Sequence, residues 1–115
     1  MEERIKISIL MDYYGILLTD KQLDIMNLYY NDDLSLSEIS EINNTSRQAI
    51  HDIIKRCNKL LLDYEEKLKL MNNNIIFEQA KKNIIKKINT VLSNATNQSS
   101  LISLIDDIKK DIMDL

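Results

Sequence analysis

The sequence predicts an all-α protein: a four-helix helix-turn-helix module with a long fourth helix, followed by two C-terminal helices. The 115 residues include no proline and a single glycine, which suits long helices better than a turn-rich β fold. Apolar residues recur at three- and four-residue spacings along most of the chain, as on one face of a helix. We expect a helix-turn-helix domain over residues 1–71, with its motif at about 35–59, and a C-terminal helical dimerisation segment over residues 72–115.

The first two helices are predicted before residue 31. The first runs from about Glu3 to Tyr14 and carries an apolar residue at every fourth position: Ile5, Ile9 and Tyr13. Gly15 stands where a left-handed residue would end that helix. The second helix starts at Thr19, which forms a capping box with Gln22, so that each side chain bonds to a free backbone amide of the first turn.

Two more capping boxes mark the starts of the third and fourth helices. They pair Ser35 with Glu38, and Thr45 with Gln48. The fourth helix then meets no stop signal before the asparagines at 72–74. That gives it about 26 residues and a length of about 39 Å, more than a compact helix-turn-helix needs.

The segment between the third and fourth helices has the spacing of a helix-turn-helix. The motif needs a small residue where the two helices cross, and Ser40 fills that position. Four residues later the turn needs a residue that tolerates positive φ, and Asn44 stands there. Apolar residues that close the core flank the turn at Ile39, Ile50 and Ile53.

The fourth helix is the candidate recognition helix. With Ile50 taken as the inward direction, a rotation of about 100° per residue places Ile53, Ile54 and Cys57 inward as well. The polar face that remains is the candidate nucleic-acid-binding set: Ser46, Arg47, Gln48, His51, Asp52, Lys55, Arg56 and Lys59. We expect Arg47 and Gln48 to contact bases, and the basic residues from 55 to 59 to contact phosphates. Asp52 could orient Arg56, four residues further on.

Two further helices follow, at about 75–92 and from residue 101, joined by a polar linker at 93–100. The fifth carries a secondary basic face of Lys81, Lys82, Lys86 and Lys87. The sixth is short and strongly apolar on one side, and a helix of that length is marginal in water unless it docks. We expect it to dimerise two chains through Leu101, Leu104, Ile105, Ile108, Ile112 and Leu115, with docking on its own chain as the alternative.

The charge is unevenly distributed along the chain. The net charge is −3, yet residues 1–44 carry −6 whereas residues 45–60 and 78–98 carry +3 each. Because local charge matters more than the total for phosphate binding, an acidic protein can still bind nucleic acid. The alternative is that solvent-exposed helix faces vary in charge without any role in binding.

Several classes of protein are not expected from this sequence. His51 is the only histidine and has no partner at metal-ligand spacing, and no phosphate loop or nucleophile elbow occurs, so we expect no cofactor, metal or enzyme activity. Cys57 cannot form an internal disulfide and lies on the inward face, which indicates a core residue in a reducing cytoplasm. No apolar run approaches the roughly 20 residues of a membrane span, so no membrane insertion is expected.

A set of stretches in the first 70 residues occurs in the same order, without a gap, in a known family. They are Tyr14-Gly15, Leu17-Leu18-Thr19, Lys21-Gln22, Leu28-Tyr29-Tyr30, Asp33-Leu34-Ser35-Leu36, Glu38-Ile39, Ser46-Arg47-Gln48-Ala49, Asp52, Lys55-Arg56, Tyr64-Glu65 and Lys67-Leu68. In these stretches the sequence resembles the YlxM family of bacterial helix-turn-helix proteins. The same module resembles region four of bacterial sigma factors, in the winged helix-like DNA-binding class.

The resemblance implies a regulatory DNA-binding protein. It also implies a link to the signal recognition particle pathway of protein targeting, with the particle's GTPase or its receptor as a partner. The sequence therefore leaves two hypotheses: a dimeric DNA-binding regulator, or an RNA- or protein-binding accessory factor of that GTPase and its RNA.

Overall fold

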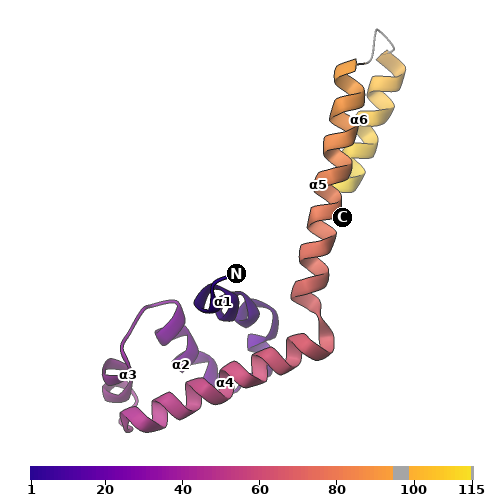
Figure 1. The fold of residues 1–115 in the computed structure, drawn as a ribbon. Coiled ribbons are helices and arrows are strands. Elements are labelled where there is room, and N and C mark those ends of the chain that lie inside the picture. Colours follow the sequence, from indigo (N-terminus) through magenta and orange to yellow (C-terminus); the bar gives the residue numbers. More distant parts are fainter. Residues whose placement is uncertain (95–98, 115) are drawn as a thin grey trace. The chain divides into compact units, whose positions relative to one another are not determined.

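The computed structural model describes residues 1–94 and 99–114, and within them the chain is helical with no strand (Figure 1). The helices in order are α1 (Glu3–Tyr14), the 3-10 helix η1 (Gly15–Leu17), α2 (Asp20–Tyr30), α3 (Leu36–Ile42), α4 (Arg47–Leu68), α5 (Leu70–Asn94) and α6 (Ser99–Met113). The predicted all-α class is confirmed. None of these helices is both long and apolar enough to cross a membrane. Contacts divide the chain into an N-terminal unit, residues 1–72, and a C-terminal unit from residue 73 onward.

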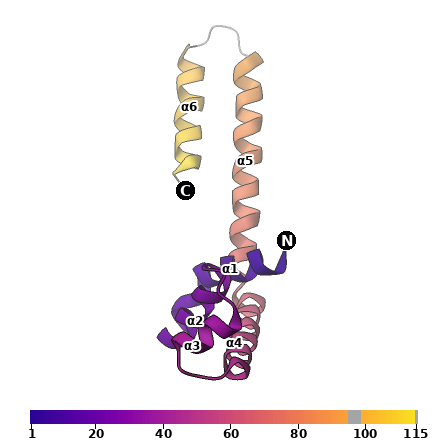
Figure 2. The same cartoon turned by 90° about the vertical axis from the view of Figure 1, so that its left-hand side faces the viewer.

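In the N-terminal unit, α1, α2 and α3 each pack against the long helix α4 (Figure 2). The core between them consists of fully or nearly fully buried apolar side chains: Ile7, Leu10, Met11, Tyr14, Leu18, Ile25, Met26, Ile39, Ile50, Ile54, Cys57, Leu61 and Met71. Burying one such side chain contributes about 1.5–3 kcal/mol before conformational entropy is subtracted. Because α4 contributes a residue to nearly every layer of this core, the candidate recognition helix is held along its length.

The buried face of α1 differs from the repeat that predicted the helix. Ile7, Leu10 and Tyr14 point into the core, whereas Ile5 is 51% exposed. The polar end of α1 is instead anchored by Arg4, whose guanidinium donates to the backbone oxygen of Tyr29 at 2.8 Å.

The prediction for Gly15 is wrong in its conformation. Gly15 has φ −56° and ψ −31°, a right-handed conformation that starts η1, so no left-handed residue ends α1. Its lack of a side chain serves packing instead: a Cβ here would lie 3.1 Å from Cδ1 of Leu23 on α2. The glycine lets the turn after α1 pass close to α2.

The predicted end of the fourth helix is also wrong. Instead of running to residue 71, α4 stops at Leu68, Lys69 takes a left-handed conformation with φ 55°, and α5 starts at once. The asparagines at 72–74 lie inside α5 and end no helix. Glu65 stabilises the break, since its carboxylate accepts from the amides of Met71 (3.0 Å) and Asn72 (2.9 Å) in the first turn of α5.

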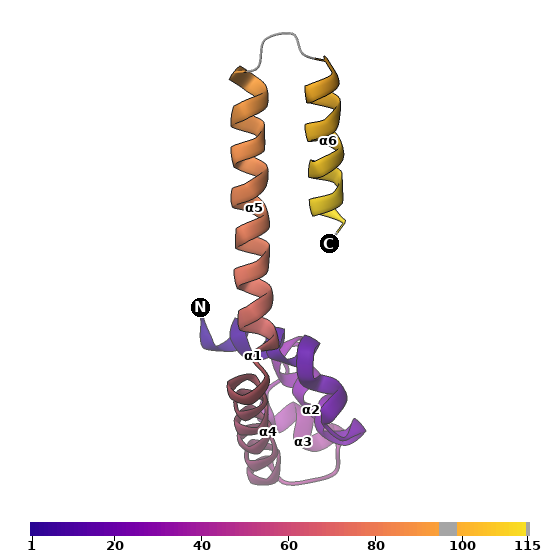
Figure 3. The same ribbon diagram turned by 90° about the vertical axis from the view of Figure 1, so that its right-hand side faces the viewer.

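The C-terminal unit is an antiparallel pair made by α5, from residue 73, and α6 (Figure 3). The two helices are joined at one level by a hydrogen bond from Lys109 Nζ to Asn89 Oδ1 at 2.7 Å. Residues 95–98, the middle of the predicted linker, lie outside the described part of the chain.

Candidate nucleic-acid interface

The turn between α3 and α4 is built by Asn44. This residue has φ 51°, as its position in the motif predicted. Its amide donates to the carbonyl of Glu41 at 3.4 Å, and the amide of Thr45 donates to the carbonyl of Ser40 at 3.0 Å. These two bonds make a Schellman motif, which satisfies the last carbonyls of α3 and reverses the chain tightly. Asparagine supplies the left-handed residue that the motif requires.

Ser40 is the small residue that the motif predicts at the crossing of α3 and α4. It is a buried polar residue, with 9% of its surface exposed, and its hydroxyl donates to the carbonyl of Ser37 at 2.7 Å. The residues on either side of the turn, Ile39 and Ile50, are fully buried. A small, internally satisfied residue at this point lets α3 approach α4 closely enough to fix its angle.

Two of the three predicted capping boxes are present. Gln22 N donates to the Thr19 hydroxyl (3.1 Å) and Thr19 N donates back to the Gln22 amide oxygen (3.0 Å). The same exchange links Ser35 and Glu38: Glu38 N donates to the Ser35 hydroxyl, and Ser35 N donates to the Glu38 carboxylate. Hydrogen bonding of this carboxylate to the Ser35 backbone, and then to its side chain, lowers the pKa of Glu38. Both boxes hold their helices at the predicted first residue.

The third capping box is wrong by one residue. The N-cap of α4 is Ser46, whose hydroxyl accepts from the amide of Ala49 at 3.1 Å. The amide of Thr45 closes the Schellman motif, so it cannot also donate to the Gln48 side chain as a capping box would require. Gln48 is therefore free of capping and its Nε2 donates to the Asp52 carboxylate at 2.9 Å.

One face of α4 is exposed from its first residue to Lys59. The exposed side chains on it are Arg47, Gln48, His51, Asp52, Lys55, Arg56 and Lys59. The opposite face is buried through Ile50, Ile54 and Cys57, and Ile53 packs at the edge of the core. The structure thus brings together on one surface the residues that the sequence assigned to binding, with Ser46 at its start.

Asp52 contacts Gln48 and His51 and not Arg56, the partner expected from its spacing. Besides accepting from Gln48, its Oδ1 lies 3.6 Å from Nδ1 of His51. The single acid of this face is therefore engaged with the two polar residues of the first turns. The cations further along, which include Arg56, extend from the same face.

Leu36 joins this surface, which sequence reasoning missed. With Arg47, Gln48 and His51 it lines a shallow groove of about 370 Å³ between the first turn of α3 and the first turns of α4. A partial signal was available, because Leu36 is the first helical residue after the Ser35 cap and lies one turn before Ile39 and Ser40, on the same side of α3. The groove puts an apolar side chain beside the residues predicted to contact bases.

Electrostatics favour an anionic partner at this end of α4. Four cationic side chains and one acid lie between residues 47 and 59. The helix N-terminus adds a partial positive charge from its unpaired amides. Cys57 does not contribute, because it is fully buried and burial raises the pKa of its thiol.

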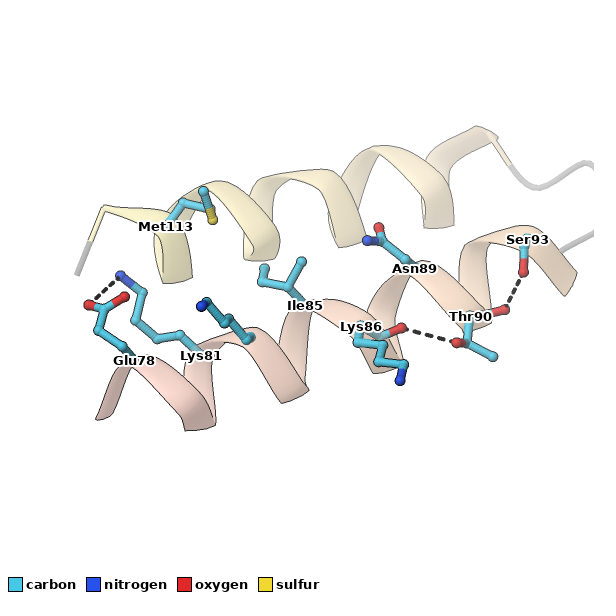
Figure 4. A pocket seen from close by; sticks show the side chains of 9 residues that line it. Glu78, Lys81, Ile85, Lys86, Asn89, Thr90, Ser93 and Met113 are labelled. Atoms are coloured by element: carbon cyan, nitrogen blue, oxygen red, sulfur yellow. Dashed lines mark hydrogen bonds and ion pairs between the residues drawn. The ribbon is translucent and has the colours of Figure 1, made fainter. Parts of the chain in front are cut away.

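The lysines predicted as a secondary basic face do not share one surface. Three of them, Lys81, Lys82 and Lys86, line a groove of about 550 Å³ along α5 that Met113 of α6 closes (Figure 4). Lys81 is largely covered: its Nζ is 3.7 Å from Glu78 Oε1 and lies over the Phe77 ring. Lys87 lines a different groove, which has no lining residue in common with the first.

The residues predicted for dimerisation divide into two groups. Ile105 and Ile112 are half-buried, as is Ile102, on the side of α6 that faces α5. Leu101, Leu104 and Ile108 are 40%, 58% and 44% exposed. Leu115 lies outside the described residues.

The Schellman turn at Asn44, the small residue at the helix crossing and the exposed basic face of α4 define an all-α helix-turn-helix protein. Comparison with known proteins places it further. The chain belongs to the UPF0122 family, described as "Putative helix-turn-helix protein, YlxM / p13 like", which matches residues 1–110.

Relatives of this chain occur among clostridia. A UPF0122 protein of Clostridium novyi is 59% identical over 113 residues, covering 98% of this chain and 97% of the relative. One from Clostridium acetobutylicum is 54% identical over 112 residues, covering 97% and 96%. One from Clostridium perfringens is 69% identical over 70 residues, covering 61% and 62%.

Proposed function

We propose that this protein is a cytoplasmic DNA-binding regulator that inserts the start of α4 into the major groove. The observation that carries the proposal is the exposed face of α4. It presents Arg47 and Gln48 at the N-terminal end of a helix that follows a tight helix-turn-helix turn. In proteins with this motif, the first residues of the second helix meet base edges, while other side chains hold the phosphates.

The proposed contacts divide by position along α4. Arg47, in the first turn, carries the guanidinium that pairs bidentately with guanine, and Gln48 carries an amide suited to adenine. Lys55, Arg56 and Lys59 lie two to three turns later, where they would neutralise phosphates. Leu36 would add an apolar contact of the kind made with thymine methyl groups.

Titration of the full chain with duplex pools at two salt concentrations tests the proposal. Binding should weaken steeply with salt because each neutralised phosphate releases counterions. Lys59→Ala should weaken binding to all sequences equally and reduce the salt slope by about one. Lys67→Ala is the matched control, since Lys67 is exposed on the last turn of the same helix and outside the proposed face. Binding that is absent or independent of salt refutes the proposal.

The proposal includes a homodimer. Dimeric helix-turn-helix proteins place two recognition helices in successive major grooves, and two modest interfaces then act on one duplex. A binding site made of two half-sites about one helical turn apart is the expected result of a selection from random DNA.

The alternative is an RNA- or protein-binding accessory factor of the signal recognition particle GTPase and its RNA. The feature that favours it is the basic groove of α5, where Lys82 and Lys86 are exposed on one side of the helix. A pulldown with the GTPase, its receptor and the particle RNA distinguishes the two. Retention of any of these with no retention of duplex DNA favours the accessory factor.

A further inference from the structure

The C-terminal helical pair leaves one of its two faces apolar and open. On α5, the exposed apolar residues Phe77, Ile84 and Val91 repeat every seven positions. On α6 they continue with Leu101, Leu104 and Ile108. A shallow groove of about 220 Å³ runs between the helices on this face, lined by Lys87, Ile88, Val91, Ile105 and Ile108.

The pair has no interior of its own. Among its described side chains from residue 73 onward, no apolar residue is buried, and even Ile85, Ile88 and Leu92 on the α6-facing side of α5 are only half-buried. A helical unit of about 40 residues usually needs a further partner, a metal or a disulfide to be stable. This face therefore requires a covering partner for the unit to be stable.

We infer that the covering partner is a second copy of this chain, which docks face to face and forms a four-helix bundle with α5 of each chain beside α6 of the other. The inference deepens the proposed homodimer by naming its surface and orientation. The charges of the two helices are the reason for choosing a second copy as the partner. From residue 78 onward α5 carries four lysines and one glutamate, whereas α6 carries three aspartates and two lysines.

A lysine of α5 and an aspartate of α6 flank the open face at the same height along the helical pair. The hydrogen bond between Lys109 and Asn89 sets the register of the antiparallel pair, and two residues further on Lys87 and Asp111 fall at the same level. At about 100° per residue, each lies at the outer edge of the open apolar face of its helix. Lys87 lines the groove on this face.

Only one symmetric arrangement uses this alignment. A twofold axis parallel to the helices keeps every residue at its level and sets α5 opposite α6 of the partner, so each Lys87 faces an Asp111 across the interface. All neighbouring helices are then antiparallel, as in an up-down-up-down bundle. A twofold axis perpendicular to the helices would set α5 against α5, with like charges opposed.

The solution mass of the full chain gives the first test, by sedimentation equilibrium at micromolar concentration. A dimer is expected. Leu104→Glu should yield a monomer with unchanged helix content, because Leu104 is 58% exposed and supports no interior contact. Ile16→Glu is the matched control, since Ile16 is 90% exposed but lies outside the C-terminal unit. A monomeric wild type, or a dimeric Leu104→Glu variant, overturns the inference.

Charge reversal gives the second test and fixes the orientation. Lys87→Glu and Asp111→Lys should each weaken the dimer about tenfold, because each turns two attractive pairs into repulsive ones. Mixing the two variants should restore a heterodimer of wild-type affinity, since both cross-interface pairs are then complementary. If the double variant in one chain recovers but the mixture does not, the pair lies within the chain and the orientation is wrong.

Failure here is distinguishable from failure of the DNA proposal. A monomer that still binds duplex DNA with steep salt dependence overturns the bundle and leaves the recognition helix. A dimer that binds no duplex supports the bundle and refutes DNA binding.

Discussion

Replacing Tyr14 with phenylalanine tests the contact that ends α4. The Tyr14 hydroxyl donates to Glu65 Oε1 at 2.6 Å and accepts from the amide of Leu70 at 3.0 Å. It therefore joins α1 to the last turns of α4 and to the first residue of α5. Phenylalanine keeps the buried ring, which is 1% exposed, and removes only these bonds.

The loss of unfolding free energy depends on how Glu65 and the Leu70 amide are satisfied once the Tyr14 hydroxyl is removed. A hydrogen bond to a charged acceptor contributes about 1.5–3 kcal/mol. The Leu70 amide adds little, because Leu70 is 47% exposed and water can replace the hydroxyl there. Glu65 also keeps its bonds from Met71 and Asn72. We expect Tyr14→Phe to lower the free energy of unfolding by about 2 kcal/mol.

Urea unfolding followed by tyrosine fluorescence measures this change in the N-terminal unit alone, since all five tyrosines lie between residues 13 and 64. Tyr13→Phe is the matched control. Its ring is half-buried beside Tyr14, and no hydrogen bond of its hydroxyl occurs in the described part of the chain. The control should change the unfolding free energy by less than about 0.5 kcal/mol.

The effect should depend on pH through Glu65. Burial acts to raise the pKa of Glu65, but the bonds from Tyr14, Met71 and Asn72 outweigh it and hold the pKa below its usual value. A lowered carboxyl pKa stabilises the fold above the unfolded value of about 4.3, and that contribution is lost as the pH falls through the folded pKa. The difference between wild type and Tyr14→Phe should therefore shrink below pH 4.

Two results would refute this reasoning. Equal losses in Tyr14→Phe and Tyr13→Phe would show that the hydroxyl contributes nothing beyond a generic phenol. A Tyr14→Phe effect that stays constant down to pH 3 would show that the ionised carboxylate is not the acceptor that matters.

At alkaline pH the difference in unfolding free energy between wild type and Tyr14→Phe should not change up to about pH 10, because burial and the Glu65 bond raise the pKa of Tyr14.

Four further substitutions have defined outcomes in the same unfolding assay. Ser46→Ala should cost about 1 kcal/mol by removing the α4 cap, and Thr45→Ala clearly less, so a larger loss at Thr45 would restore the capping box expected from sequence. Gly15→Ala should change stability by under about 1 kcal/mol, because the flexible Leu23 end can move by a few tenths of an ångström; a loss of several kcal/mol would contradict that. Ile50→Ala should cost about 2–5 kcal/mol through a cavity at the helix crossing, and retention of full stability would show that α3 and α4 do not share this core.

Local signals predicted the N-terminal half of this structure well. The starts of α2 and α3 were predicted to the residue, because a capping box satisfies its helix end with side chains only three residues away. The left-handed conformation at Asn44 was predicted for a similar reason, since the turn requires positive φ whatever surrounds it. In both cases the cause lies within the segment itself.

Predictions failed where the cause lies far away in the chain. The end of α4 depends on Glu65 and on Tyr14, 51 residues earlier, and no periodicity within 60–74 reveals that contact. Gly15 was misread because its neighbour is Leu23 on another helix. The candidate binding face of α4 was predictable from a single inward residue, Ile50, whereas Leu36 comes to it only through the packing of α3 on α4.

The hydrogen bond between Gln48 and Asp52 has a consequence for the entropy of recognition. A glutamine side chain that becomes fixed only on contact loses about 1.5–2 kcal/mol of rotamer freedom. Here the amide already donates one of its two hydrogens to Asp52, which leaves its oxygen and the other hydrogen free. Part of that ordering is therefore complete before any ligand arrives. Asp52 serves the surface by reducing the number of conformations from which Gln48 must be selected.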